Sequence, residues 1–147
     1  MLSKLGLIFI LFFFLISSVF AGFYDASTVY EKLLKKESSG VYYRNNYVFV
    51  IADIEIKDTR ARRFYYEGKA MLKTLQLLKA HITSEISKFY GSDHEKDDKK
   101  NKIQLMDLKI SKIRARILIN RKSGNYFRRV SLFDPALIER IVRQAIR

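Results

Sequence analysis

Cysteine is absent from this chain of 147 residues, and proline occurs only once. The missing cysteines exclude disulfide bonds, a thiolate nucleophile and cysteine-ligated zinc or iron–sulfur centres. They also exclude the lipid-modified N-terminus of a bacterial lipoprotein. Glycine is scarce as well, with six residues, whereas 48% of the chain is hydrophobic. This composition argues against a disordered or collagen-like chain and favours one packed domain.

Acidic residues are outnumbered by basic ones. The chain has 28 Lys and Arg against 15 Asp and Glu, which gives a formal net charge of +13. An excess of this size invites a function in binding nucleic acids or membrane surfaces. The charge alone does not separate these classes, so the location of the protein has to be read from another feature.

The first 21 residues have the pattern of a secretory signal peptide. Lys4 is the only charged residue before Asp25, and it precedes an apolar stretch that ends in small residues at Ala21. We predict cleavage after Ala21 and a periplasmic or secreted location for residues 22–147, because a small exported domain without disulfides fits a periplasm-like compartment. The alternative is an uncleaved N-terminal anchor, although residues 5–21 fall just short of the roughly 20 apolar residues of a membrane span.

The beginning of the exported region predicts a short helix and then a β-hairpin. Asp25 or Ser27 is a candidate cap for a helix over residues 28–37. Residues 41–43 and 47–57 read as strands, and the turn between them contains two asparagines. One face of the second strand is apolar throughout, so we expect it to be buried along its length. The other face changes from apolar to charged halfway, and on that face we expect only the first half to be buried.

The longest predicted element is a helix over residues 60–90, with Asp58 or Thr59 as its N-cap and Gly91 at its C-terminal end. Its apolar stripe steps by three or four residues. We expect the stripe to dock on the sheet rather than to form a coiled coil. The stripe contains Ala61, Phe64, Gly68, Met71, Leu75, Leu78, Ile82, Ile86 and Phe89.

Residues 91–102 contain no apolar side chain and read as a charged loop. A group of metal-ligand types lies in this loop: Asp93, His94, Glu95, Asp97 and Asp98. These residues have no fixed ligand spacing, and lysines interrupt them. We therefore predict no metal site, because a site needs preorganised ligands.

The C-terminal third predicts a hairpin and a final helix. Apolar alternation over residues 105–119 shifts parity near Ser111-Lys112, which indicates a bulge, a bend or two short strands. Residues 120–125 read as a turn and residues 126–133 as the returning strand. Asp134 and Pro135 then begin a helix that runs to the end of the chain.

These elements predict an α+β domain over residues 22–147. We expect an antiparallel sheet with the long helix and the short C-terminal helix packed on one face.

Enzyme motifs are missing from the sequence. It has no nucleophile elbow, no P-loop and no dinucleotide-binding glycine pattern. His81 is expected on a flank of the long helix as a partly buried structural residue. Asp53 and Glu55 lie on one strand face about 7 Å apart, and their basic neighbours favour ion pairs over catalysis. We predict a non-enzymatic protein without a cofactor.

The positive charge is grouped with aromatic residues at two places that we predict to be a contact patch. The patch contains Arg60, Arg62, Arg63, Arg128 and Arg129. Three cations near a helix N-terminus oppose the helix dipole, at a cost of a few tenths of a kcal/mol to about 1 kcal/mol each, so contact with an anionic partner is the better explanation. An inert basic surface is the alternative. Because the predicted signal peptide over residues 1–21 directs the chain out of the cytosol, the expected partner is an envelope protein or an anionic envelope component, not a nucleic acid.

The final helix provides a second candidate surface. Its apolar face and flanking arginines fit either a partner protein or the interface of an anionic membrane. The residues concerned are Leu137, Ile138, Ile141, Arg140 and Arg143. Peripheral membrane contact through this helix and the basic patches is therefore the alternative function. Self-association stays open.

The segment Ile-x-x-Ile-Arg-Ala-Arg-Ile-Leu-Ile over residues 110–119, followed by Gly-Asn-Tyr-Phe-Arg-Arg-Val over residues 124–130, resembles the bacterial lipoprotein-20 family and its flagellar outer-membrane-associated relatives. The resemblance covers residues 47–133 and the order strand, long helix and hairpin. The lipobox cysteine of that family is absent here, and the helix carries fewer alanines. The resemblance implies a non-enzymatic envelope component that assembles with other proteins, with a flagellar association, and it transfers no site residues.

Overall fold

The computed structural model of this chain describes residues 25–88, 110 and 112–146. Contacts divide the chain into two compact units, Met1–Lys36 and Glu37–Arg147, and each is described by itself. The expected leader, the loop over residues 91–102 with its His94 cluster, and the strand start near residue 105 lie outside the described residues. The single domain expected over residues 22–147 stays a prediction.

The first unit contains a short helical segment. The chain is α-helical from Asp25 and continues as the π-helix η1, Tyr30–Leu34. Glu31 and Lys35 form an ion pair of 2.9 Å along it. The expected caps are wrong, because Asp25 and Ser27 already lie inside the helix. The helix was nevertheless expected in this region.

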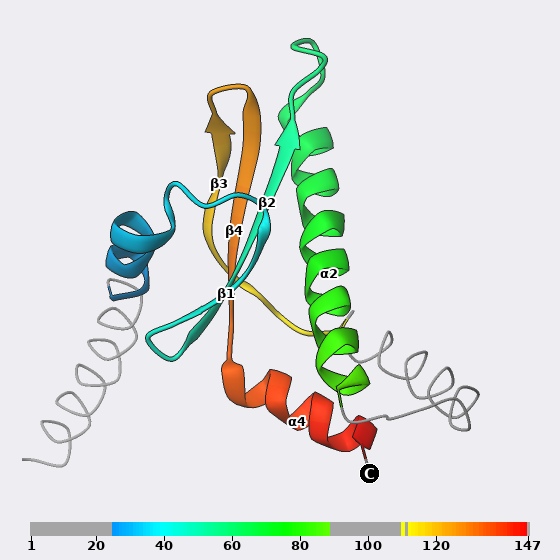
Figure 1. The fold of residues 1–147 in the computed structure, drawn as a ribbon. Coiled ribbons are helices and arrows are strands. Elements are labelled where there is room, and N and C mark those ends of the chain that lie inside the picture. Colours follow the sequence, from blue (N-terminus) through cyan, green and yellow to red (C-terminus); the bar gives the residue numbers. More distant parts are fainter. Residues whose placement is uncertain (1–24, 89–109, 111, 147) are drawn as a thin grey trace, which may run out of the picture. The chain divides into compact units, whose positions relative to one another are not determined.

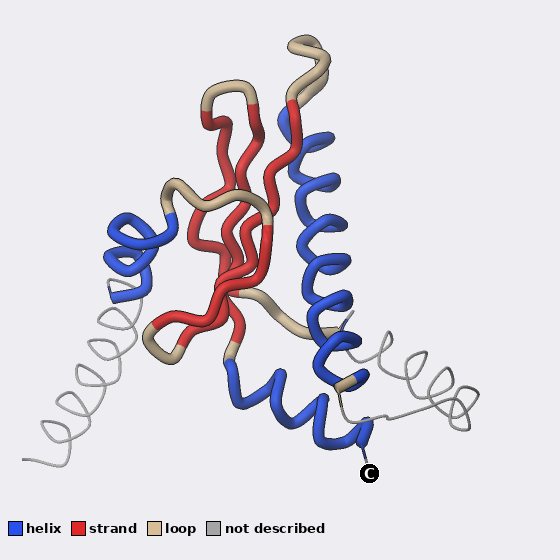
Figure 2. Tube along the Cα trace, in the orientation of Figure 1, coloured by secondary structure: helices blue, strands red, loops and turns tan. Residues whose placement is uncertain are grey.

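The second unit is built on a four-stranded antiparallel sheet with the order β1-β2-β4-β3 (Figures 1 and 2). Strands β1 (Gly40–Arg44) and β2 (Tyr47–Glu55) form the expected hairpin. Its turn consists of Asn45 and Asn46, whose φ values of 47° and 63° are both left-handed. Asparagine tolerates this region better than most residues, which explains why the turn forms without glycine.

Strands β3 (Arg116–Ser123) and β4 (Tyr126–Phe133) form the second hairpin. The turn is shorter than expected, because Gly124 and Asn125 suffice for it and β3 runs on through residues 120–123. The register shifts between Ile117 and Ile119, so a bulge lies at this point of β3. The sequence placed the irregularity near residues 111–112, of which the first lies outside the described residues.

The long helix α2 (Arg63–Ser87) begins three residues later than expected. Arg62 is the N-cap and makes no side-chain capping bond. Asp58 does not cap the helix. Its Oδ1 atom instead accepts a 2.9 Å hydrogen bond from the backbone N–H of Arg60, which closes a turn ahead of the helix.

The buried side of α2 also differs from the expected stripe in its first half. Its buried residues follow each other at intervals of four: Tyr66, Ala70, Thr74, Leu78, Ile82 and Ile86. Steps of four rotate the buried line by about 40° each around a helix of 3.6 residues per turn, as packing along a twisted sheet requires. Phe64, Met71 and Leu72 are consequently exposed at 67%, 47% and 58%.

Helix α4 (Pro135–Ile146) begins as expected, with Asp134 Oδ1 accepting a 2.9 Å hydrogen bond from Ala136 N–H. Its buried side shares one core cluster with α2 and β2. The cluster includes Val48, Val50, Leu78, Ile82, Ile138 and Ile141. The predicted α+β fold with both helices on one face of an antiparallel sheet is therefore confirmed.

A smaller cluster closes the other end of the α2–sheet contact. Tyr66, Ala70 and Phe127 form it, and the rings of Tyr66 and Phe127 stack with centroids 6.2 Å apart. In the described part of the chain, no helix combines the length and the apolar character that crossing a membrane requires.

Candidate functional site

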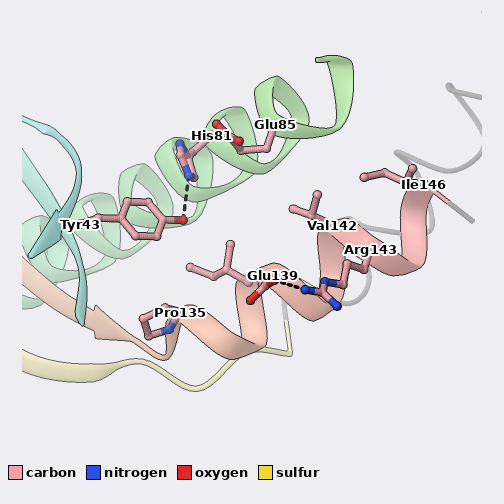
Figure 3. A pocket seen from close by; sticks show the side chains of 9 residues that line it. Tyr43, His81, Glu85, Pro135, Glu139, Val142, Arg143 and Ile146 are labelled. Atoms are coloured by element: carbon pink, nitrogen blue, oxygen red, sulfur yellow. Dashed lines mark hydrogen bonds and ion pairs between the residues drawn. The ribbon is translucent and has the colours of Figure 1, made fainter. Parts of the chain in front are cut away.

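A groove of about 840 Å³ lies between α2 and α4 beside the end of β1 (Figure 3). Strand β1 contributes Tyr43 to its lining, and α2 contributes His81 and Glu85, which are one helical turn apart. The α4 side of the groove is lined by Pro135, Ile138, Glu139, Val142, Arg143 and Ile146. The volume is within the range of about 300–1,000 Å³ that is usual for ligand sites.

The Tyr43 hydroxyl and His81 Nε2 are joined by a hydrogen bond of 2.9 Å. The rings lie 5.3 Å apart at 49°. Tyr43 reaches α2 because it lies opposite Val48, and Val48 belongs to the sheet face that packs on the helix. Strand register thus brings together two residues that are 38 positions apart.

The two rims of the groove each carry an ion pair. Glu85 of α2 pairs with Lys88, which follows the helix directly, and Glu139 pairs with Arg143 on α4. Pro135, Val142 and Ile146 make the surface between the rims apolar, and the buried side chain of Ile138 lies behind them. The groove therefore combines an apolar floor with charges of both signs at its edges.

Partial burial holds Tyr43 and His81 in their neutral forms. Burial raises the pKa of Tyr43, and the nearby Glu85 carboxylate raises it further. Burial lowers the pKa of His81, and this outweighs the opposite influence of Glu85. Both shifts therefore favour the uncharged form of the group concerned.

The predicted arginine patch is not a continuous surface. Arg60, Arg62 and Arg63 lie at the start of α2 and are exposed. Arg128 and Arg129 are neighbours on β4 and therefore project from opposite faces of the sheet. The patch is thus divided between the helix start and two sheet faces.

Arg128 is bound within the fold. Its guanidinium makes two hydrogen bonds of 2.7 Å to the Asp53 carboxylate and one of 2.8 Å to the Glu37 carbonyl oxygen. The side chains of Arg128 and Asp53 are only 15% and 13% exposed. The charge of Arg128 is consequently neutralised by Asp53 and is not available to bind an anionic partner.

Arg129 lies on the helix-facing side of β4, opposite Ala52. Burial lowers its pKa, and the Glu67 carboxylate opposes this effect. Arg63 is exposed, but it pairs with Glu67 at 2.7 Å and donates to the Asn120 carbonyl oxygen at 3.1 Å. The exposed members of the patch that form no ion pair within the described residues are therefore Arg60 and Arg62.

The predicted surface on α4 is divided in the same way. Ile138 and Ile141 are 3% and 4% exposed and belong to the core, and Leu137 packs against its edge. Arg140 and Arg143 are exposed. The apolar residues expected to meet a membrane or a partner are thus already packed within the domain.

The acidic pair on β2 is separate from the histidine. Asp53 is tied to Arg128, and Glu55 lies 3.6 Å from Lys57. Neither Asp53 nor Glu55 lines the groove that contains His81. Among the described residues, no three or more His, Asp and Glu side chains come together as a metal site.

The groove residues Tyr43, Glu85 and Glu139 were not predicted from the sequence as site residues. The alternation of Val41 and Tyr43 was a signal that Tyr43 faces the helix, and the four-residue spacing of His81 and Glu85 placed both on one helix side. The position of α4 beside α2 has no such signal, because it depends on long-range packing.

Comparisons with known proteins do not identify a relative of this chain. A scan against protein-family models and searches of curated proteins and of solved structures found no match to this chain. The resemblance to the lipoprotein-20 family therefore stays a prediction, and the function has to be inferred from the geometry of the site.

Proposed function

We propose that this chain is an exported, non-enzymatic binding module of the cell envelope whose α2–α4 groove receives an apolar helical segment of an envelope protein. The observation that carries the proposal is the groove, which has an apolar floor between two helices. Helix-lined apolar grooves are common receptors for amphipathic helices. A flagellar location, as the lipoprotein-20 resemblance implies, is one setting for such a partner.

The charges at the rims favour a helix with charges of both signs beside its apolar face. The side chains of Glu139 and Arg143 are 61% and 70% exposed, so both can exchange partners with an incoming segment. Exposed ion pairs contribute only about 0–1 kcal/mol each. Replacing these ion pairs by pairs between the groove and an incoming segment therefore costs little free energy.

The proposal is tested by site-specific photocrosslinking in intact cells of the native host. A photoreactive residue at Val142, in the groove, is expected to give one crosslinked product of defined mass. The same residue at the exposed position Gln76 on α2 is the control and should give none. Ile146→Glu should reduce the yield from Val142, because a charge on the apolar floor opposes burial of an apolar face.

Equal products from Val142 and Gln76, or a yield that Ile146→Glu leaves unchanged, would contradict the groove as receptor. Export is tested separately by N-terminal sequencing of the chain recovered from the host. Gly22 as the first residue supports the cleaved leader. A chain that keeps residues 1–21 supports the uncleaved anchor.

The alternative is a cationic peripheral protein that inserts the apolar face of α4 into an anionic membrane. It has less support, because Ile138 and Ile141 would have to leave the core cluster to reach lipid. Burying such a side chain is worth about 1.5–3 kcal/mol, which the membrane would have to replace.

A further inference from the structure

Helix α2 has an exposed apolar surface in its first half. Phe64, Met71 and Leu72 are exposed at 67%, 47% and 58%. Gly68 lies among them, and a Cβ atom added there would contact no side chain from another turn or element within 4 Å. We call Phe64, Gly68, Met71 and Leu72 the outer face of α2. None of them lines the α2–α4 groove, so the outer face is separate from the site of the proposed function.

Helix geometry directs the outer face away from the sheet. Gly68 and Leu72 are each two residues from the buried Ala70, and Phe64 is two residues from the buried Tyr66. Two residues correspond to about 200° around a helix with 3.6 residues per turn. The outer face is therefore on the side of α2 opposite to the one that packs on the sheet (Figure 1). Contiguous exposed apolar surface of this kind marks an interaction site.

The acidic residues of α2 lie to one side of the outer face and are already paired. The helix contains two of them, Glu67 and Glu85. Glu67 pairs with Arg63 at 2.7 Å. Glu85 lines the groove with α4 and pairs with Lys88. The outer face is thus not bordered by an unpaired carboxylate of this helix.

The other border of the outer face is aromatic and positively charged. Lys69 Nζ lies 4.4 Å from the ring centroid of Tyr65, which is 46% exposed. A cation–π contact of this kind attracts the ammonium group without neutralising its charge. No acidic residue is three or four positions from Lys69, where side chains of a helix meet. The exposed Arg62 at the N-cap adds a cation that forms no ion pair within the described residues.

We propose that the outer face of α2 binds the surface of an anionic lipid bilayer, with the helix lying along that surface. An apolar helix face bordered by cations suits the boundary between headgroups and acyl chains. Aromatic side chains such as Phe64 and Tyr65 are favoured at the same depth. A second copy of the chain is the less suitable occupant, because pairing two outer faces would bring cations together in one interface.

This contact differs from insertion of α4, because it leaves the core cluster intact. Phe64, Met71 and Leu72 are already exposed, whereas Ile138 and Ile141 would have to leave the core. The groove between α2 and α4 stays open to its own partner while the outer face rests on lipid, since the two surfaces share no residue.

The test uses the absence of tryptophan from the chain, which allows a single tryptophan to report lipid contact at a chosen position. Leu72→Trp and Met71→Trp report on the outer face. Ile117→Trp on β3, at a position 46% exposed, is the matched control, and Leu137→Trp reports on α4. Each full-length variant is mixed with vesicles of brominated phosphatidylcholine, with and without phosphatidylglycerol, and quenching of the tryptophan by bromine is measured. Residues 1–21 are the same in all variants, so differences in quenching belong to the reporter position.

We expect vesicles with phosphatidylglycerol to quench Leu72→Trp and Met71→Trp but not Ile117→Trp. In the Leu72→Trp background, Phe64→Ser should raise the lipid concentration for half-maximal quenching about tenfold. Lys69→Gln should raise it about fivefold. Lys112→Gln removes an exposed cation elsewhere and should leave it unchanged.

The proposal is overturned by equal quenching in Leu72→Trp and Ile117→Trp, by no quenching in either outer-face variant, or by quenching that does not require phosphatidylglycerol. Quenching confined to Leu137→Trp overturns it in favour of α4. A blue shift of the Leu72→Trp emission without vesicles, which grows with protein concentration, overturns it in favour of a second copy. Far-UV circular dichroism checks that each variant keeps the fold.

Discussion

At the scale of single residues, the Tyr43–His81 pair shows how environment decides the chemistry of a site. Both groups are titratable types, yet partial burial shifts the pKa of each toward the neutral form. The lowered pKa of His81 means that the folded state binds a proton less readily than the unfolded chain. His81 therefore contributes stability above about pH 6.5, and this contribution is lost as the pH falls through the folded pKa.

We predict that NMR titration of the His81 ring gives a pKa below its ordinary value. Glu85→Gln should lower it further, because the carboxylate of Glu85 favours the protonated ring. Glu67→Gln is the control and should leave the His81 pKa unchanged. A His81 pKa that rises in Glu85→Gln would contradict this account of the groove.

The ion pairs of β2 differ in their surroundings, so they should differ in energy. Arg128→Met leaves the largely buried Asp53 carboxylate without its guanidinium, and we expect a loss of about 3 kcal/mol in the free energy of unfolding. Lys57→Met breaks the pair with Glu55, whose side chains are 82% and 62% exposed, and should cost no more than about 0.5 kcal/mol. Urea unfolding measures both, and equal losses would show that burial is not the deciding factor.

At the scale of elements, the β1–β2 turn depends on the backbone conformation of its two asparagines. Asn46→Ala places a side chain with no special tolerance at φ 63°, and we expect a loss of about 1 kcal/mol in the free energy of unfolding. Asn46→Gly should cause no loss, because glycine adopts this region freely.

Asn125→Ala in the second hairpin is the matched control. Among the described residues, Asn45 and Asn46 are the non-glycine residues with positive φ, so Asn125→Ala should have a smaller effect than Asn46→Ala. Similar losses in urea unfolding at the two positions would argue against conformational strain as the cause.

At the scale of the whole molecule, α2, α4 and the sheet of residues 37–147 share one core cluster. We predict that Ile82→Ala and Ile138→Ala each lower the free energy of unfolding by about 3 kcal/mol. Leu72→Ala, at a position 58% exposed, should change it by no more than about 0.5 kcal/mol.

Thermal unfolding followed by far-UV circular dichroism and by tyrosine fluorescence should show coincident transitions in these variants. A transition in which Ile138→Ala affects only part of the signal would mean that α4 unfolds separately. In that case its apolar face would be available to a membrane, as the alternative function requires.

Much of the fold follows from local patterns. The Asn45-Asn46 turn, the period of α2 and the Asp134-Pro135 start of α4 were readable because each depends on neighbouring residues. The start of α2 was misplaced because Asp58 uses its carboxylate to close a turn before the helix. The stripe was misplaced because Phe64 and Met71 fit a helical period but lie off the side that meets the twisted sheet.

The candidate sites were less predictable than the elements. The sequence grouped Arg128 with the contact residues, but the β2–β4 register places it opposite Asp53, which takes up its charge. Arg121 and Lys122 were expected in the turn over residues 120–125 and were not included in the predicted contact patch. They line a pocket because the hairpin returns to the start of α2.

By itself, the sequence determined the elements in the second unit, its α+β class and its excess of positive charge, because propensity, alternation and composition are local or additive properties. The tertiary structure decided which charges are neutralised, which apolar side chains stay exposed, and where α2 and α4 leave a groove. These outcomes depend on strand register and helix docking, and both are set by contacts between residues that are far apart in the chain.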